Sequence, residues 1–194
     1  MILRTGLKTI ICILLVLLFC AVKQAGSLNS SAPTPLPDDL ESLKAELSKY
    51  KTWTLVNPKP VLMDPVAAVA CAAPNIGPPS PHSNKYILVY VNEIGRAAMM
   101  SEKHPRFPQG TIIVKEKLSE ETSRLPELLT VMVKRSEGYD QGNGNWDYYV
   151  VSGDGSKVER PANVRSCQRC HLAHKGSDFV SRIYLPNSVR ERLK

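Results

Sequence analysis

The sequence predicts an α+β domain that is mainly an antiparallel β-sheet with a few short helices. Short runs of β-branched and aromatic residues recur along the second half of the chain, separated by Gly, Pro, Asn and Asp. Most segments between these runs lack helical periodicity, whereas a parallel sheet would need crossover helices there. The 194 residues, 43% of them apolar, suffice for one buried core.

The first 27 residues have the pattern of a targeting segment. Arg4 and Lys8 precede an uninterrupted apolar stretch over residues 10–22, and no acidic residue is present. This arrangement is typical of a signal peptide, and a stretch of 13 residues is short for a membrane-spanning helix. An uncleaved N-terminal anchor is the alternative. We therefore expect a periplasmic or otherwise exported protein.

A Ser/Pro-rich linker over residues 28–37 separates this segment from the ordered domain, which is expected over residues 38–194. Within the domain, capping residues followed by apolar residues at helical spacing predict four short helices. They cover residues 38–53, 64–71, 92–100 and 163–171.

Five strands follow from the β-branched and aromatic runs. In the second strand, alternation places Ile113, Lys115 and Lys117 on one face of the sheet and Glu116 on the other. The strands cover residues 86–91, 111–117, 128–134, 146–151 and 179–185.

Charge and cysteine content exclude two classes of protein. Without the three basic residues of the first 27, the chain has 22 basic and 18 acidic residues. No basic stripe is interleaved with aromatic residues, so we exclude a nucleic-acid partner. Cys12 and Cys20 fall in the targeting segment, which leaves too few cysteines for a disulfide-rich scaffold. The three that remain are an odd number, which needs an explanation in an oxidising compartment.

Residues 167–171 read Cys-Gln-Arg-Cys-His, the C-x-x-C-H attachment signature of haem c. On a helical turn Cys167 and Cys170 lie on one face, within reach of two porphyrin vinyl groups, and His171 follows them toward the iron. The motif predicts one covalently bound haem c per chain, held by both cysteines and ligated by His171. Cys71 is then left as a lone buried residue of apolar character.

Two other interpretations of this motif stay open. A redox dithiol normally opens a helix after a strand of a parallel α/β fold, a context that this sequence lacks. A zinc site would need a fourth ligand, which His174 could supply. The haem interpretation is preferred because haem c is attached outside the cytoplasm, in agreement with the targeting segment.

The group on the other side of the iron decides the function. A Met or His ligand would make an electron carrier, whereas an open position would bind or transform a small molecule. None of the candidates has a compelling position, so an open or weakly closed site is expected. The candidates are His82, His104, His174, Met63, Met99, Met100 and Met132.

Several sequence blocks around the motif recur together in one known family. They are Phe107-Pro108-Gln109-Gly110, which leads into the second strand, Gly144-Asn145-Trp146, Asp178-Phe179-Val180 and Tyr184-Leu185-Pro186. In these blocks, over roughly residues 53–186, the chain resembles the cytochrome P-460 family. The resemblance implies a β-sheet haem domain distinct from the helical cytochromes c. It also implies a five-coordinate haem with His171 as proximal ligand, and a homodimer.

The resemblance implies roles for two residues outside the motif. Lys115 matches the lysine that bonds covalently to the porphyrin in the hydroxylamine-oxidising members of the family. Phe107 matches the aromatic residue that caps the distal pocket in the nitric-oxide-binding members, the β-sheet cytochromes c-prime. Strand alternation permits the first role, because Lys115 shares its face with the apolar Ile113.

One departure from the enzymes concerns the distal base that oxidation of hydroxylamine requires. The enzymes have a basic residue near the position of Ile87, and the nearest carboxylates in this chain are Glu93 and Glu116. We therefore weigh two functions: an oxidoreductase acting on hydroxylamine or small nitrogen oxides, and a cytochrome that binds nitric oxide or another diatomic gas without turnover. A six-coordinate electron carrier ranks third. A soluble electron-transfer protein is an expected partner.

Overall fold

The structure is a computed structural model, and it describes residues 40–65 and 84–194. The described part comprises one sheet and four α-helices. The predicted targeting segment, the linker, Cys71 and His82 lie outside the described residues, as does most of the helix predicted at 64–71.

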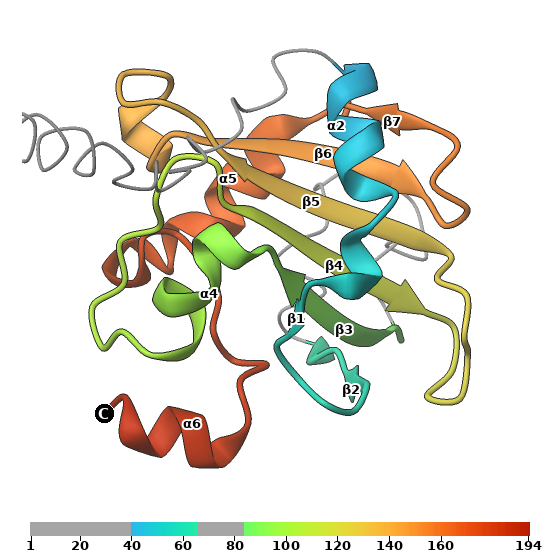
Figure 1. The fold of residues 1–194 in the computed structure, drawn as a ribbon, viewed down its shortest axis with the longest axis horizontal. Coiled ribbons are helices and arrows are strands. Elements are labelled where there is room, and N and C mark those ends of the chain that lie inside the picture. The colour runs from blue at the N-terminus through green and yellow to red at the C-terminus, as the bar shows by residue number, and fades with distance from the viewer. Residues whose placement is uncertain (1–39, 66–83) are drawn as a thin grey trace, which may run out of the picture. The chain divides into compact units, whose positions relative to one another are not determined.

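All seven strands of the described part belong to one antiparallel sheet, which confirms the predicted fold class (Figure 1). Their order is β1-β3-β4-β5-β6-β7, and β2 pairs separately with β3. Four strands lie close to their predicted bounds, while the sequence analysis missed the two-residue strands β1, β2 and β7. The strands are β1 (Thr54–Leu55), β2 (Val61–Leu62), β3 (Tyr86–Val91), β4 (Ile112–Leu118), β5 (Leu128–Lys134), β6 (Trp146–Ser152) and β7 (Val158–Glu159).

The helices are short, as predicted. Asn92 caps α4 through its side chain, which accepts a hydrogen bond from the backbone N–H of Gly95 at 3.3 Å. The helix predicted at 38–53 is instead divided into α2 and a 3₁₀ turn over Tyr50–Thr52, and α6 was not predicted. Within residues 40–65 and 84–194, no helix is long and apolar enough to cross a membrane. The helices are α2 (Leu40–Leu47), α4 (Glu93–Met100), α5 (Val164–Leu172) and α6 (Asn187–Arg192).

The prediction of a strand over residues 179–185 is wrong. This segment has no strand, because Asp178 and Phe179 both have positive φ, 53° and 64°, and turn the chain out of an extended conformation. Val180 and Leu185 are nevertheless buried. The residues of this run are therefore apolar because they contact the core, and not because they form a β-strand. A short apolar run in a sequence does not distinguish these two cases.

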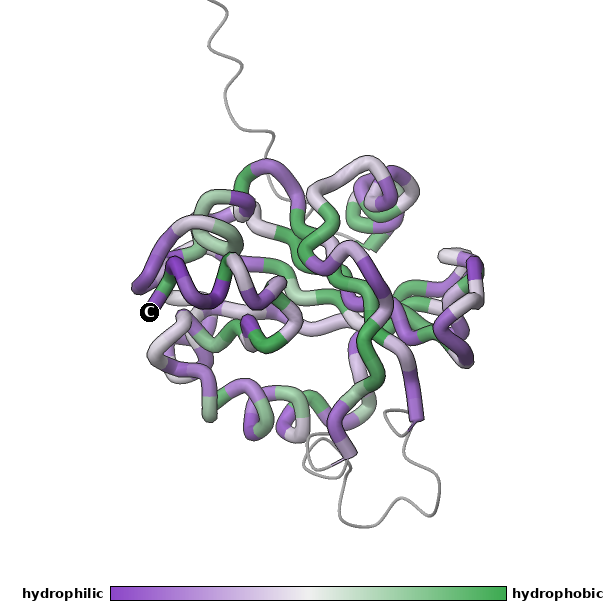
Figure 2. The backbone as a smooth tube through the Cα atoms, turned by 90° about the horizontal axis from the view of Figure 1, so that it is seen from below, coloured by the Kyte–Doolittle hydropathy of each residue, from purple (hydrophilic) through white to green (hydrophobic). Residues whose placement is uncertain are grey.

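Both faces of the sheet are buried, and Figure 2 shows apolar segments running through the middle of the domain. On one face, α2 lies in a core with Val114 and Val131; we call this the α2 face. On the other face, α4 and the segment after α5 lie in a core with Val89 and Ile113. We call this second face the site face.

Candidate functional site

A cavity of about 170 Å³ opens on the site face, where α5 and the irregular segment after it lie over the sheet. Its walls are mostly apolar and come from β3, β4, β5 and β6 as well as from these two segments. Apolar walls disfavour water and so strengthen electrostatic interactions between groups inside the cavity. The lining residues include Val89, Ile113, Met132, Tyr148, Val180 and Tyr184.

Helix α5 directs the two cysteines and the histidine of the C-x-x-C-H motif into this cavity. Cys167, Cys170 and His171 are spaced so that they share one face of the helix, and all three line the cavity. Neither thiol is in a disulfide. No residue of α5 is fully buried, as expected for a helix that leaves room between itself and the sheet.

The His171 ring is held in one orientation by a backbone contact. Its Nδ1 lies 2.8 Å from the carbonyl oxygen of Phe179. Because a carbonyl can only accept, Nδ1 carries the proton and Nε2 keeps its lone pair for a metal. Burial is the main cause that lowers the pKa of His171 to about 4; the hydrogen bond to Phe179 opposes it, and the charges of Lys115 and His174 add to it. The ring is therefore neutral, as a metal ligand must be, near neutral pH.

Lys115 reaches the same cavity from the centre of the sheet. It lies on β4, lines the cavity, and its Nζ is 5.0 Å from the ring centroid of Tyr184. Its positive charge lowers the pKa values of both His171 and His174, although burial of each ring is the larger cause. The face assigned to Lys115 from strand alternation is therefore confirmed. Its covalent bond to a porphyrin stays a prediction.

Phe107 is placed beside the cavity rather than in its wall. It is 3% exposed, and its ring lies edge-on to Trp146 with centroids 5.6 Å apart. Its backbone N–H donates to Oδ2 of Asp178 at 2.8 Å. The structure thus brings Cys167, Cys170, His171 and Lys115 together, and leaves Phe107 as a neighbour of the group. The distal role of Phe107 stays a prediction.

Three of the candidate sixth ligands line the cavity: Met99, Met132 and His174. The His174 ring centroid is only 6.5 Å from that of His171, so both imidazoles lie in the same part of the cavity. Met63, Met100 and His104 are not among the lining residues.

The carboxylates considered as distal bases lie elsewhere. Glu116 points to the α2 face, where it is fully buried and accepts a hydrogen bond from the Tyr50 hydroxyl at 2.5 Å. Glu93 is exposed at the start of α4 and pairs with Arg96. Ile87 is buried in the core of the site face but does not line the cavity. Among the described lining residues, none is Asp or Glu.

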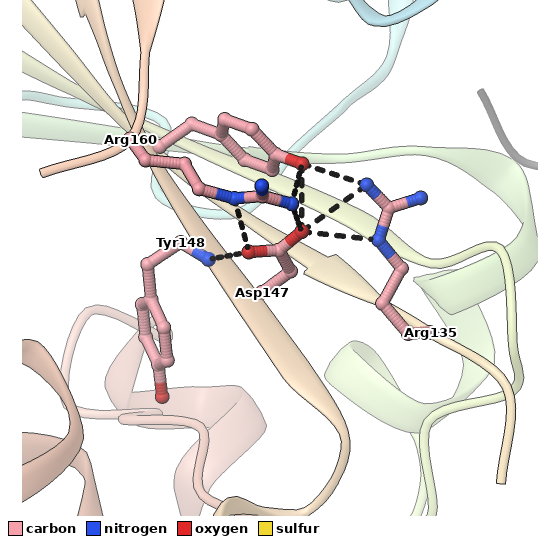
Figure 3. Close-up of polar contacts among 5 residues, drawn as sticks. Arg135, Asp147, Tyr148 and Arg160 are labelled. Atoms are coloured by element: carbon pink, nitrogen blue, oxygen red, sulfur yellow. Dashed lines mark hydrogen bonds and ion pairs between the residues drawn. The ribbon is translucent and has the colours of Figure 1, made fainter. Parts of the chain in front are cut away.

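Tyr148 is a cavity residue, although the sequence favoured an ordinary strand residue at this position over a pocket phenol. Its ring centroid lies 5.4 Å from that of His171, and its buried hydroxyl has no hydrogen-bond partner within the described part of the chain. Burial raises the pKa of this phenol, so it stays protonated. Figure 3 shows Tyr148 and the side chain of Asp147 pointing to opposite sides of β6. Tyr148 lies two residues after Trp146 in β6, so strand alternation places both side chains on the same face of the sheet. This spacing was the signal that the sequence offered.

The donor set fits a c-type haem. Two thiols that are not in a disulfide and an imidazole whose Nδ1 is engaged face one mostly apolar cavity, beside the Tyr148 hydroxyl, which has no hydrogen-bond partner among the described residues. In the described residues no three His, Cys, Asp or Glu side chains converge closely enough to hold a metal ion, so the zinc interpretation finds no cluster. The antiparallel sheet also lacks the parallel context of a redox dithiol.

Comparison with known proteins supports the same assignment. The model of the family described as Cytochrome P460 matches residues 48–182, a range that holds β3 to β6, Lys115 and the whole C-x-x-C-H motif. A search of the curated proteins found no match. The chain belongs to the cytochrome P460 family, and it is thus a c-type haem cytochrome.

Proposed function

We propose that this cytochrome is an oxidoreductase that acts on hydroxylamine or another small nitrogen compound at an open haem site. The observation that carries the proposal is the presence of Lys115 in the same cavity as Cys167, Cys170 and His171. A bound haem c would supply a redox-active iron. Cys167 and Cys170 would form the thioether bonds. His171 would bind through Nε2, because its Nδ1 is engaged by the Phe179 carbonyl.

Lys115 is the residue that distinguishes oxidation from simple binding. β4 pairs on both sides, so Lys115 is registered opposite Val89 of β3 and Thr130 of β5. The backbone under the amine is therefore fixed, and the Tyr184 ring supports the ammonium from one side. A covalent bond from Lys115 to the porphyrin would distort the macrocycle and change its electronic properties. Such a change is the basis on which we propose multi-electron oxidation.

One observation favours a second candidate, the binding of nitric oxide without turnover. Oxidation of hydroxylamine releases protons, and no Asp or Glu is found among the described lining residues. His174 is the base that remains for this task, and burial lowers its pKa. The mostly apolar walls favour a neutral diatomic molecule over a charged ligand.

The absorption spectrum and the intact mass of protein matured with a haem c export system test these alternatives. A strongly red-shifted ferrous Soret band, with a mass that requires one covalent bond beyond two thioethers, supports the oxidoreductase. An ordinary five-coordinate spectrum with two bonds favours nitric oxide binding. A sharp six-coordinate spectrum contradicts both and favours the electron carrier. Hydroxylamine oxidation is then assayed with Lys115→Arg as the matched variant.

Location and assembly belong to the same proposal. The pattern of residues 1–27 supports export, which maturation of haem c requires.

Leu172 and Ile183 are 51% and 46% exposed near the cavity, which supports contact with a second copy of the chain or a soluble electron-transfer protein. Light scattering of the haem-loaded protein tests the homodimer, and the mass of a single chain would contradict it.

A further inference from the structure

The turn that follows α5 has an unusual backbone. Asp178 and Phe179 are consecutive residues with positive φ, 53° and 64°, and neither is glycine. Left-handed conformations are unfavourable for residues with a Cβ, and they persist only where the surroundings determine them. A Cβ on Gly144 would lie 2.5 Å from the Phe179 ring, so Gly144 gives this turn the space it needs.

Contacts to the carboxylate and the backbone carbonyl of Asp178 fix the turn from three directions. Lys134 Nζ donates to both carboxylate oxygens, at 2.7 and 2.6 Å, and the Phe107 N–H donates to one of them at 2.8 Å. The Asp178 carbonyl accepts a hydrogen bond from the indole N–H of Trp146 at 2.7 Å. Lys134 and Asp178 are both buried. A buried pair with this geometry holds its partners in one arrangement.

The same turn carries the group that orients His171. Phe179 directly follows Asp178, and its carbonyl accepts the hydrogen bond from His171 Nδ1. The direction of this carbonyl depends on the left-handed turn, which depends on the Asp178 contacts. Partners of this kind fix the tautomer of a ligating histidine and raise its basicity.

We infer that Asp178, held by Lys134, is a positioning residue for His171. It fixes the Phe179 carbonyl against the ligand ring, and it links that ring to the loop that carries Phe107. This inference rests on the proposed ligation of haem iron by His171. It gives a reason for the Asp178-Phe179-Val180 block, which follows the haem motif in the sequence.

The chain offers a matched control on the other side of the sheet. Arg135, the neighbour of Lys134, pairs with the buried Asp147 at 3.2 Å on the α2 face. Arg160 also pairs with Asp147 at 2.9 Å (Figure 3). Asp147→Asn therefore weakens a buried ion pair of the same kind, next to the same strand. Asp147 reaches the cavity lining through the backbone N–H of Tyr148 and the hydroxyl of Tyr149, and its ion-pair partners are Arg135 and Arg160 rather than His171 or Lys115.

The test compares Asp178→Asn, Lys134→Gln and Asp147→Asn in haem-loaded protein. We expect the two site-face variants to lower the ferrous Fe–His stretching frequency in resonance Raman spectra. They should also raise the reduction potential, because a weaker hydrogen bond from Nδ1–H to the Phe179 carbonyl makes the imidazole a poorer electron donor to the iron. Carbon monoxide affinity should change about tenfold, as for other partners of metal ligands. Asp147→Asn should leave all three values at those of wild type. Lys134→Gln keeps the measurement available if Asp178→Asn does not fold.

Two results would overturn the inference, and they are distinguishable. If the site-face variants match Asp147→Asn in all three measurements, Asp178 has only a structural role, while the haem assignment stands. If five-coordinate ferrous wild-type protein lacks an Fe–His band, the ligation by His171 is wrong, and the inference falls with it.

Discussion

Lys134 and Arg135 are adjacent in the chain, yet they serve opposite faces of the sheet. Arg135 joins Arg160 and the Tyr149 hydroxyl around Asp147, and in this cluster charged groups contact one another (Figure 3). On the site face, Lys134 pairs with Asp178, but other polar groups line a cavity. The comparison teaches that burial of charge does not by itself mark a functional site. A functional site is indicated instead by polar groups that line a cavity.

The largest expected difference between the faces concerns covalent attachment of haem. Replacement of both Cys167 and Cys170 by Ala should abolish thioether formation, because no other cysteine lines the described cavity. Denaturing electrophoresis with haem staining measures the loss, and Asp147→Asn should stay fully stained. Covalent haem that survives the double replacement would show that the motif does not attach it.

Ligation by His171 is the next effect in size. His171→Ala removes the imidazole whose Nε2 is free to bind iron. We expect loss of the ferrous Fe–His Raman band and a change of at least about tenfold in nitric oxide affinity. His174→Ala is the control, since it removes the neighbouring ring 6.5 Å away. The assignment fails if His174→Ala abolishes the band and His171→Ala does not.

Lys115 should affect the spectrum more than the stability. Lys115→Arg keeps the positive charge near Tyr184 but cannot form the same bond to a porphyrin, so we expect the red shift and one covalent bond to disappear. Lys51→Arg is the control on the α2 face, because Lys51 Nζ also lies over tyrosine rings, 5.3 Å from Tyr50 and 5.4 Å from Tyr90. Identical spectra for wild type and Lys115→Arg would show that no cross-link forms.

The turn at Asp178 can be tested through a glycine. Gly144 and Gly138 both have positive φ, 65° and 90°, but only a Cβ on Gly144 would meet the Phe179 ring. Gly144→Ala should cost about 2 kcal/mol of unfolding free energy more than Gly138→Ala, because overpacking adds to the backbone penalty. Urea denaturation of both variants measures the difference. Equal losses would mean that the ring moves aside freely.

The smallest effect is a pH dependence on the α2 face. Burial raises the pKa of Asp147, but hydrogen bonds from Arg160 and Tyr149 and the charges of both arginines outweigh it and lower the pKa below its ordinary 3.8. A carboxyl whose folded pKa is lowered stabilises the protein above the unfolded pKa. This stabilisation is lost as the pH falls through the pKa that the carboxyl has in the folded protein. Thermal unfolding below about pH 4 should therefore show a steeper decline for wild type than for Asp147→Asn.

Local patterns predicted much of the fold and the core of the site. The strands β3 to β6 follow from β-branched runs, and the face of Lys115 follows from alternation with period two. The C-x-x-C-H spacing alone placed Cys167, Cys170 and His171 on one helical face. These are properties of residues close together in the chain.

What could not be predicted depends on distant residues. The segment after α5 has strand-like composition, but the Asp178 contacts with Lys134 and Phe107 fold it into a left-handed turn. Those partners lie 44 and 71 positions away, so no local pattern reveals them. The same is true of Glu116, whose burial against Tyr50 depends on the segment after α2.

The position of β4 in the interior of the sheet makes strand register a determinant of chemistry. Lys115 and Glu116 are consecutive, and their side chains point to opposite faces. A one-residue shift of β4 against β3 and β5 that brings Glu116 to the place of Lys115 would exchange a cation for an anion in the cavity. A single deleted residue between Gly110 and Lys115 therefore brings Glu116 to the place of Lys115, whereas a single inserted residue brings the uncharged Val114 there.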